Sequence, residues 1–210
     1  MATRARTSAP ILESRSGLDP PRWIGGSLLL AEAYSLAASA HGSQRRPTDR
    51  RLFLDHVAEV GRLLDRAGCD DELVAVGLLH DAVERGTLNA EQLEERMGPR
   101  ISSLVLALSE DPAIASFDQR KAGLRSQVER AGEPAMTVYA ADKLSDILGL
   151  RRGVETHADG LEERMGTGVS SMAAHYGESV EMIEATTPDS VFLPDLHLEL
   201  GRLEEAIRQA

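Results

Sequence analysis

A run of seven residues without polar side chains, 73–79, ends directly in a histidine and an aspartate, His80 and Asp81. The run has a helical pattern and is expected to lie in the core of the fold. Burying an imidazole beside a carboxylate costs free energy unless a partner compensates them, and a metal ion is one such partner. A second histidine, His56, also interrupts an apolar helical pattern. The sequence therefore predicts a metal site that is built from helices.

Helical patterns account for most of the chain, and no strand pattern or internal repeat competes with them. Ala, Leu, Glu and Arg dominate the 210 residues and clusters of β-branched residues are few, which favours an all-α fold. Glycines, prolines and capping residues mark the ends of the segments. The predicted helices cover residues 27–41, 50–67, 70–85, 89–98, 99–108, 117–130, 134–159 and 194–208, with a weaker helical stretch at 161–184.

One helical domain is expected at residues 22–210, because this length is enough for a sizeable core. Its central part is expected at 27–155, followed by C-terminal helices at 160–210. Residues 1–21 are rich in Ser, Thr, Arg and Pro, which predicts a flexible N-terminal tail. The apolar stripe of the last helix packs either on the core or on another copy of the chain. The sequence is therefore compatible with both a monomer and a homo-oligomer.

Charge and composition limit the partners. The formal net charge is −11, and an acidic surface repels phosphate backbones and anionic lipids, so we expect no bulk nucleic acid and no membrane partner. No apolar run approaches the roughly 18 residues that a membrane helix needs, and the N-terminus does not read as a secretory signal. The single Cys69 excludes an internal disulfide and fits a reducing cytoplasm, the expected location. Four arginines within 45–51 either bind a small anion or are solvated surface charges.

His56 and His80 are expected at the same height on neighbouring helices. Gly68 and Cys69 form a tight turn, and His56 lies 12 residues before Gly68 while His80 lies 12 residues after it. Such a turn makes the two helices antiparallel neighbours, and a rise of about 1.5 Å per residue puts both imidazoles roughly 18 Å from it. Asp81 is rotated by roughly 100° from His80 but still reaches an ion in the groove.

Asp142 is the best candidate for a fourth ligand, because it is an acid that breaks the apolar segment 136–146. On pattern alone, a surface aspartate paired with Lys143 is an equal alternative. Two histidines and two aspartates suit Mn²⁺, Fe²⁺, Mg²⁺ or Zn²⁺ and leave coordination positions for water and substrate. Such an ion lowers the pKa of water and holds phosphate oxygens. A closed structural zinc site fits less well, since those sites usually contain cysteine.

Three segments resemble the hydrolase domain of RelA/SpoT-type alarmone enzymes and small stand-alone alarmone hydrolases, which are HD-domain metal-dependent phosphohydrolases. Residues 40–46, AHGSQRR, are similar to the family's H-x-x-Q-x-R loop. Residues 74–84, VAVGLLHDAVE, are similar to A-x-L-L-H-D-x-x-E, and residues 140–146, AADKLSD, to A-D-R-L-H-N. The resemblance spans roughly 27–155. It implies an all-α HD-domain helical bundle that removes the 3′-pyrophosphate from guanosine tetra- or pentaphosphate, a phosphorylated nucleotide.

The same resemblance implies a role for individual residues. The ion, Mn²⁺ by this analogy, would be held by His56, His80, Asp81 and Asp142. Glu84 would orient or activate the attacking water, next to Asp81. The residues implied to contact the substrate are Arg46, Gln44, Lys121, Lys143 and Asp146.

The chain departs from this family in two places. Residues 84–87 read ERGT where the family has E-D-T, so that Arg85 replaces a second acid and either binds phosphate or faces solvent. Residues 49–55, DRRLFLD, replace the G-x-P-Y segment before the first metal histidine and include one extra residue. The alternatives are therefore an HD phosphohydrolase of a different nucleotide, a non-catalytic HD protein that binds a nucleotide or a partner, and a structural bundle whose buried His and Asp pair with each other.

The remaining histidines of the C-terminal part are expected at the surface or at helix ends. They are His157, His175 and His197.

Overall fold

The computed structural model describes residues 20–84, 88–156 and 160–210. Within these ranges it consists of helices and contains no strand, apart from an isolated bridge between Arg45 and Leu52. The prediction of an all-α fold is therefore confirmed. The predicted tail lies outside the described residues, except for Pro20 and Pro21. No helix in the described ranges is long and apolar enough to span a bilayer.

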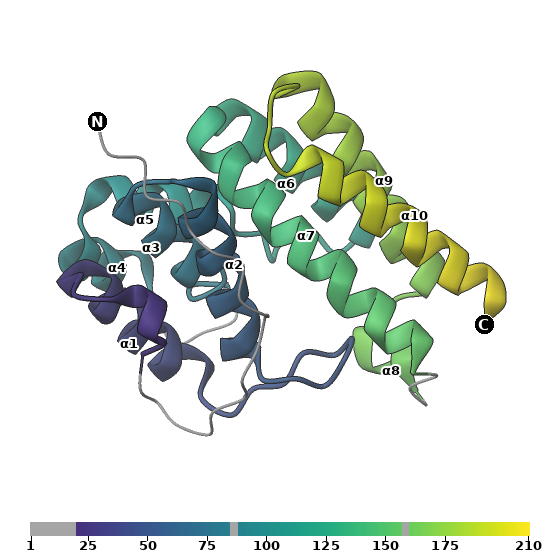
Figure 1. Ribbon diagram of the computed structural model, residues 1–210, viewed down its shortest axis with the longest axis horizontal. Coiled ribbons are helices and arrows are strands. Elements are labelled where there is room, and N and C mark those ends of the chain that lie inside the picture. The colour runs from purple at the N-terminus through teal and green to yellow at the C-terminus, as the bar shows by residue number, and fades with distance from the viewer. Residues whose placement is uncertain (1–19, 85–87, 157–159) are drawn as a thin grey trace.

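Ten α-helices and one short 3₁₀ helix are described, and Figure 1 shows their arrangement. In chain order they are η1 (Arg22–Ile24), α1 (Leu28–His41), α2 (Phe53–Ala67), α3 (Asp71–Leu79), α4 (Ala90–Met97), α5 (Pro99–Ala107), α6 (Phe117–Ala131), α7 (Glu133–Glu155), α8 (Leu161–Met165), α9 (Val169–Thr186) and α10 (Leu193–Gln209).

The long helix α7 runs through the middle of the fold (Figure 1). It contacts α2, α3 and α5 on one side and α6, α9 and α10 on the other. In this central position most residues of α7 are buried, including the polar residues Asp142, Lys143 and Ser145. Three neighbouring polar side chains are thus held inside the fold at the centre of its longest helix.

Helices α2 and α3 form a close antiparallel pair because a glycine lies where they meet. A Cβ atom on Gly77 of α3 would lie 2.4 Å from Leu64 Cδ1 of α2, so a larger residue there would force the Leu64 side chain to move. Gly68, with a φ of 83°, ends α2 in the left-handed conformation that glycine tolerates. Asp70 then caps α3 by accepting a hydrogen bond from the Leu73 N–H. The predicted turn between these helices is confirmed.

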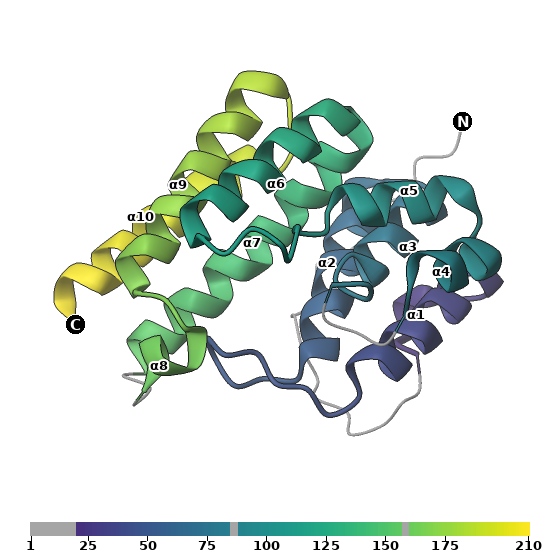
Figure 2. The same cartoon turned by 180° about the vertical axis from the view of Figure 1, so that it is seen from behind.

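The start of α2 differs from the prediction. The helix begins at Phe53 rather than at residue 50, because Arg50 has a φ of 62°, which an α-helix cannot contain. Residues 42–52 instead form a loop that reaches across to α7 and α8 (Figure 2). There the Arg164 Nε donates a hydrogen bond to the Pro47 carbonyl at 3.1 Å, and a Cβ on Gly153 of α7 would lie 2.5 Å from the Thr48 carbonyl oxygen.

The end of α3 also differs from the prediction. The helix ends at Leu79, and residues 80–84 form turns. The predicted end at residue 85 lies outside the described residues, as does the predicted end of α7 at residue 159. A capping box starts α4, because Asn89 and Gln92 each accept the other's backbone N–H.

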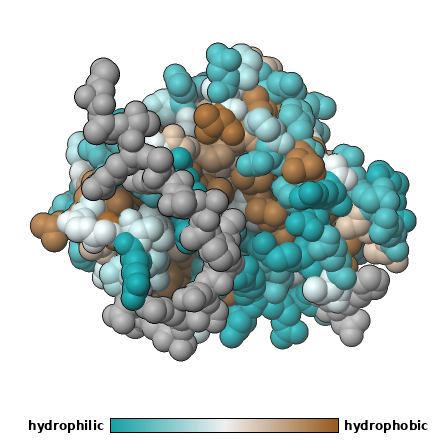
Figure 3. All heavy atoms as spheres, viewed as in Figure 1, coloured by the Kyte–Doolittle hydropathy of each residue, from teal (hydrophilic) through white to brown (hydrophobic). Residues whose placement is uncertain are grey.

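The apolar stripe of α10 packs on the chain's own core. Leu196 and Leu203 are fully buried where α10 contacts α7 and α9. Most of the surface in Figure 3 is hydrophilic, and apolar residues show mainly near the middle of this face. Among the described residues, the exposed large apolar side chains are Leu28, Leu106, Val191 and Leu198.

Candidate metal centre

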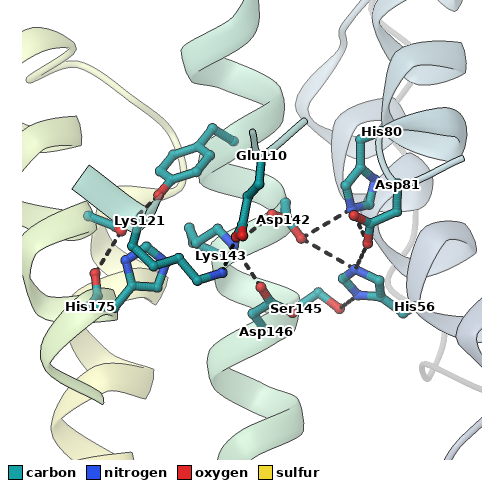
Figure 4. Close-up of polar contacts among 12 residues, drawn as sticks. His56, His80, Asp81, Glu110, Lys121, Asp142, Lys143, Ser145, Asp146 and His175 are labelled. Carbon is teal, nitrogen blue, oxygen red and sulfur yellow. Dashed lines mark hydrogen bonds and ion pairs between the residues drawn. The ribbon is translucent and has the colours of Figure 1, made fainter. Parts of the chain in front are cut away.

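Four side chains from three segments converge beside α7, as Figure 4 shows. The Nε2 atoms of His56 and His80 each lie 3.3 Å from the Asp142 Oδ1 atom. Asp81 Oδ2 lies 3.3 Å from the Nε2 of His80 and 3.9 Å from that of His56. The two imidazole centroids are 5.2 Å apart, which confirms the predicted matching height of the histidines.

The hydrogen bond of His80 determines which of its nitrogens carries a proton. Its Nδ1 lies 2.8 Å from the Gly77 carbonyl oxygen, which can only accept, so Nδ1–H is the donor. The Nε2 atom therefore presents its lone pair to the cluster unless it takes up a second proton. This buried Nε2 has no hydrogen-bond partner among the described residues.

His56 is held in the same tautomer by a different route. Its Nδ1 lies 2.9 Å from the Ser145 Oγ, and the Ser145 hydroxyl donates in turn to the Glu59 Oε2 at 2.6 Å. Because the hydroxyl proton points to Glu59, the Ser145 oxygen accepts from Nδ1–H of His56. Its Nε2 lone pair then faces Asp142.

This arrangement fits a divalent metal ion. Two imidazole lone pairs and two carboxylates meet in a buried place, and without a cation between them they repel one another. The ligand atoms of His56, His80 and Asp142 lie within 4.8 Å of one another, a spacing that could hold one ion. Nitrogen and oxygen donors of this kind suit a hard or borderline divalent ion.

The electrostatics of the site also favour a cation. Burial lowers the pKa of His80, but the neighbouring carboxylates of Asp81 and Asp142 outweigh burial and raise this pKa well above its usual value. Burial raises the pKa of Asp142, yet Lys143 and His80 hold it well below its usual value. His56 differs, because burial and the nearby Arg46 lower its pKa. The cluster thus attracts positive charge, which a proton on His80 or a metal ion can provide.

Three members of the cluster, His80, Asp81 and Asp142, line a pocket. Other residues that line the pocket include Arg46, Glu84, Glu110, Lys121, Lys143, Asp146 and Tyr176. Among them are several of the predicted site residues, from segments on both sides of α7. Gln44 is the exception. It is exposed, its Oε1 lies 3.3 Å from the His41 Nδ1, and its contact with substrate stays a prediction.

Lys143 links two carboxylates of the site. Its ammonium lies 2.9 Å from the Asp142 Oδ2 and 2.7 Å from the Asp146 Oδ2, and both acids raise the pKa of the lysine against the effect of burial. Asp142 therefore makes both predicted contacts: it pairs with Lys143 and it faces the imidazoles. The pair is buried rather than at the surface.

The buried side chain of Arg46 packs against α7 and forms hydrogen bonds with it. Its guanidinium donates to the Ser145 carbonyl at 3.3 Å and to the Asp146 Oδ1 at 2.9 Å, and the side chain is buried. Gly149 leaves room for it, since a Cβ there would lie 2.6 Å from the Arg46 Nη2. The loop before α2 is thereby held against α7.

On the opposite side of the pocket, Glu84 and Lys121 meet Glu110. The Glu84 Oε2 accepts the Glu110 backbone N–H at 2.9 Å. The Glu110 carboxylate pairs with the Lys121 ammonium and, at 2.6 Å, with the Arg120 Nε. These cations outweigh the effect of burial and lower the pKa of Glu110. Arg85, where the chain departs from the resembled family, lies outside the described residues.

Several residues of the site were not singled out from the sequence. Ser145 follows Asp142 by three positions on α7, and Glu59 follows His56 by three on α2, so helical spacing was a usable signal for both. Glu110 and Tyr176 had no such signal, because they reach the pocket from segments that approach only in the folded chain.

The expectation for His175 was wrong. It lies within α9 and is only 3% exposed, with its Nδ1 accepting from Arg125 Nη1 at 2.8 Å. His197 lies at the surface as predicted, since half of its side chain is exposed. His157 lies outside the described residues.

Comparison with known proteins identifies the family. The HD domain matches residues 33–147, which is more than half of the chain, so this protein belongs to the HD domain family. The resemblance to HD-domain phosphohydrolases that the sequence motifs indicated is thereby confirmed.

Two curated relatives indicate which HD proteins are similar. The guanosine-3′,5′-bis(diphosphate) 3′-pyrophosphohydrolase MESH1 of Danio rerio is 30% identical over 130 residues, which cover 59% of this chain and 70% of the relative. The GTP pyrophosphokinase rsh of Brucella ovis is 36% identical over 81 residues, which cover 39% of this chain. The matched region spans only 11% of the Brucella protein.

A solved structure shares the fold. It is described as a metazoan ortholog of SpoT that hydrolyses ppGpp, and it superposes with a TM-score of 0.65 at 24% sequence identity. The superposition covers 87% of this chain and 96% of the other, so the shared fold extends beyond the region matched by the HD domain.

Proposed function

We propose that this protein is a metal-dependent phosphohydrolase that removes the 3′-pyrophosphate from guanosine 3′,5′-bis(diphosphate). The observation that carries the proposal is the convergence of two imidazole Nε2 atoms and two carboxylates beside a pocket that basic side chains also line. The similarity to MESH1 of Danio rerio, which is named for this activity, supports the choice of substrate.

The metal ligands of the proposal are His56, His80, Asp81 and Asp142. Mn²⁺ is the proposed ion, because mixed nitrogen and oxygen ligands with open positions suit it and the resembled family implies it. Once bound, a divalent ion would neutralise phosphate oxygens and lower the pKa of water. The protein's own part is to orient the ligands: the hydrogen bonds of the two Nδ1 atoms do this for His56 and His80, and Lys143 pairs with Asp142.

The proposed reaction is a transfer of the pyrophosphoryl group to water. Water adds to the phosphorus that is attached to the 3′ oxygen, the bond from that phosphorus to the 3′ oxygen breaks, and the products are guanosine diphosphate and pyrophosphate. Glu84 is the proposed acceptor of the proton that water loses, and the Glu110 N–H holds its carboxylate. The 3′ oxygen gains a proton as it leaves.

Basic residues of the pocket would bind the phosphates. Lys143 lies beside the metal ligand Asp142, and Lys121 lies on the opposite side, held by Glu110. Arg46 reaches the pocket from the loop before α2. A phosphate group that binds here would replace hydrogen bonds to water with hydrogen bonds to these cationic donors. Hydrogen bonds between charged groups are stronger than those between neutral groups.

A second candidate is hydrolysis of a different, less charged nucleotide. It is favoured by the carboxylates that already pair with each basic residue: Asp146 with Arg46 and Lys143, and Glu110 with Lys121. Asp146 stands where the resembled family has an asparagine, so it adds a negative charge close to the substrate. A tetraphosphate would meet more repulsion here than a monophosphate.

The test is a substrate screen with purified, Mn²⁺-loaded protein. The screen includes guanosine 3′,5′-bis(diphosphate) and the common nucleoside mono-, di- and triphosphates, with products separated by anion-exchange chromatography. Pyrophosphate and guanosine diphosphate in equal amounts are the expected products, and they should vanish in an Asp142→Asn variant. Turnover of another nucleotide alone would favour the second candidate, and no turnover with metal bound would reject both in favour of a non-catalytic HD protein.

We also propose one domain over residues 22–210, because α7 packs against helices of both halves. A cytoplasmic location completes the proposal, since the single Cys69 suits a reducing compartment.

A further inference from the structure

Both ring nitrogens of His56 contact polar side chains of a single helix. Asp142 lies 3.3 Å from the Nε2 atom and Ser145 lies 2.9 Å from the Nδ1 atom, and both residues belong to α7 (Figure 4). They are three positions apart and so share one face of the helix. The ring can therefore adopt either of two neutral tautomers, each satisfied by one of these neighbours.

The two tautomers differ in their value for metal binding. With the proton on Nδ1, His56 donates to Ser145 and its Nε2 is free to bind an ion. With the proton on Nε2, the ring donates to Asp142 and the nitrogen that faces the cluster is blocked. Asp142 Oδ1 lies 3.3 Å from the Nε2 atom as an acceptor, so this contact by itself favours the blocked tautomer.

Glu59 acts against the blocked tautomer. It lies one turn after His56 on α2, and its Oε2 accepts the hydroxyl proton of Ser145 at 2.6 Å. A carboxylate can only accept, so the hydroxyl is turned away from the imidazole and its lone pair toward it. Ser145 is fully buried, so no water competes for its hydroxyl.

We propose that Glu59 is a positioning residue for the metal centre, which acts through Ser145 to hold His56 in the tautomer that binds the ion. The inference rests on the proposed metal-dependent function. It assigns a role in that function to Glu59 and Ser145, which are not themselves metal ligands. Partners of this kind behind a metal-binding histidine typically change metal affinity by about 10- to 100-fold.

The first measurement is the affinity for Mn²⁺, titrated calorimetrically into protein freed of metal with a chelator. Ser145→Ala removes the acceptor for Nδ1–H and should raise the dissociation constant by about 10- to 100-fold. Glu59→Gln keeps the shape but offers an amide that can donate to the hydroxyl, and it should raise the constant by about tenfold. Asp55→Asn is the matched control, because Asp55 lies on the same helix and lines the same small cavity as Glu59. Like Glu59→Gln, this substitution removes one negative charge. The Mn²⁺ dissociation constant of Asp55→Asn should stay within about twofold of the wild-type value.

The second measurement reads the tautomer directly, by nitrogen-15 NMR of the metal-free protein with labelled histidine. The wild type and Asp55→Asn should show His56 protonated on Nδ1, whereas Ser145→Ala and Glu59→Gln should show the form protonated on Nε2. Circular dichroism establishes that each variant is folded. Should Ser145→Ala unfold, Glu59→Gln decides alone, since Glu59 is only partly buried.

The outcomes separate this inference from the function on which it rests. If the wild type binds Mn²⁺ but both variants bind it equally well with His56 still protonated on Nδ1, the positioning role is wrong and the metal site stands. If the wild type binds no divalent ion, the metal site is wrong and the inference falls with it. If Asp55→Asn lost as much Mn²⁺ affinity as Glu59→Gln, the loss would be due to the removal of a negative charge rather than to the contact with Ser145. This result would also overturn the inference.

Discussion

The His80 Nδ1 atom donates a hydrogen bond to the carbonyl oxygen of Gly77, three residues earlier, at 2.8 Å. The last carbonyls of an α-helix lack backbone partners, and here a side chain provides one at the point where α3 ends. The same bond turns the Nε2 atom of His80 toward Asp142. The end of the helix and the direction of the metal ligand are therefore set by one interaction.

Metal removal should lower stability. Without an ion the buried carboxylates and imidazoles face one another uncompensated, whereas an ion at about 100 times its dissociation constant adds about 2.7 kcal/mol to the free energy of unfolding. Differential scanning calorimetry with Mn²⁺ and with a chelator should show a higher midpoint with the metal. A His80→Asn variant should lose this difference, and a metal-independent midpoint in the wild type would contradict the prediction.

Glu84→Gln should separate catalysis from metal binding. The variant keeps an oxygen to accept the Glu110 N–H but cannot accept a proton from water, so kcat should fall by about 10²- to 10⁴-fold. The Mn²⁺ dissociation constant should stay close to that of the wild type. An unchanged kcat would remove Glu84 from the proposed chemistry.

Gly149→Ala should disturb the substrate pocket through Arg46. The added Cβ would lie 2.6 Å from the Arg46 Nη2, so the guanidinium must leave its place beside Asp146. We expect a loss of about 1–3 kcal/mol in stability and a raised KM. Gly201→Ala on α10 is the control, because no atom lies within 4 Å of its Cβ, and it should be neutral or slightly stabilising. Equal effects of the two changes would show that Arg46 is not held as described.

His175 should make the protein less stable in mild acid. Burial and the charges of Lys143, Lys121 and Arg125 lower its pKa to about 2, whereas in the unfolded chain it titrates near its ordinary value of 6.5. Below pH 6.5 the unfolded state therefore binds a proton that the folded state refuses, and stability falls by up to about 1.4 kcal/mol per pH unit. Above pH 6.5 this histidine has no such effect.

Urea titrations at pH 7 and pH 5 check the His175 prediction. The wild type should lose about 2 kcal/mol more than a His175→Gln variant over this interval, since the variant lacks the titrating group. Comparing the two proteins removes the contribution of other groups that titrate in both. An identical loss in both proteins would mean that His175 is protonated in the folded state.

Much of the site followed from rules that act along a helix. The equal distances of His56 and His80 from Gly68 were enough to predict that the imidazoles meet, because the turn and the rise per residue fix their heights. Asp142 was harder, since a surface pair with Lys143 explained the pattern equally well. In the structure both contacts exist, because α7 lies in the middle of the fold and buries the pair.

The parts that were missed depend on contacts between distant segments. His175 was expected at the surface or at a helix end, but the packing of α9 against α6 and α7 buries it. Glu110 enters the pocket from the segment after α5, and nothing local indicates that it pairs with Lys121. The early end of α3 depends on the His80 side chain replacing a backbone donor, which a helical pattern does not reveal.

The most direct test of the central claim is anomalous diffraction from crystals grown with Mn²⁺. A single metal peak is expected about 2.2 Å from His56 Nε2, His80 Nε2 and oxygens of Asp81 and Asp142. A peak elsewhere, or none at this cluster at saturating Mn²⁺, would contradict the metal centre and the hydrolase function proposed from it.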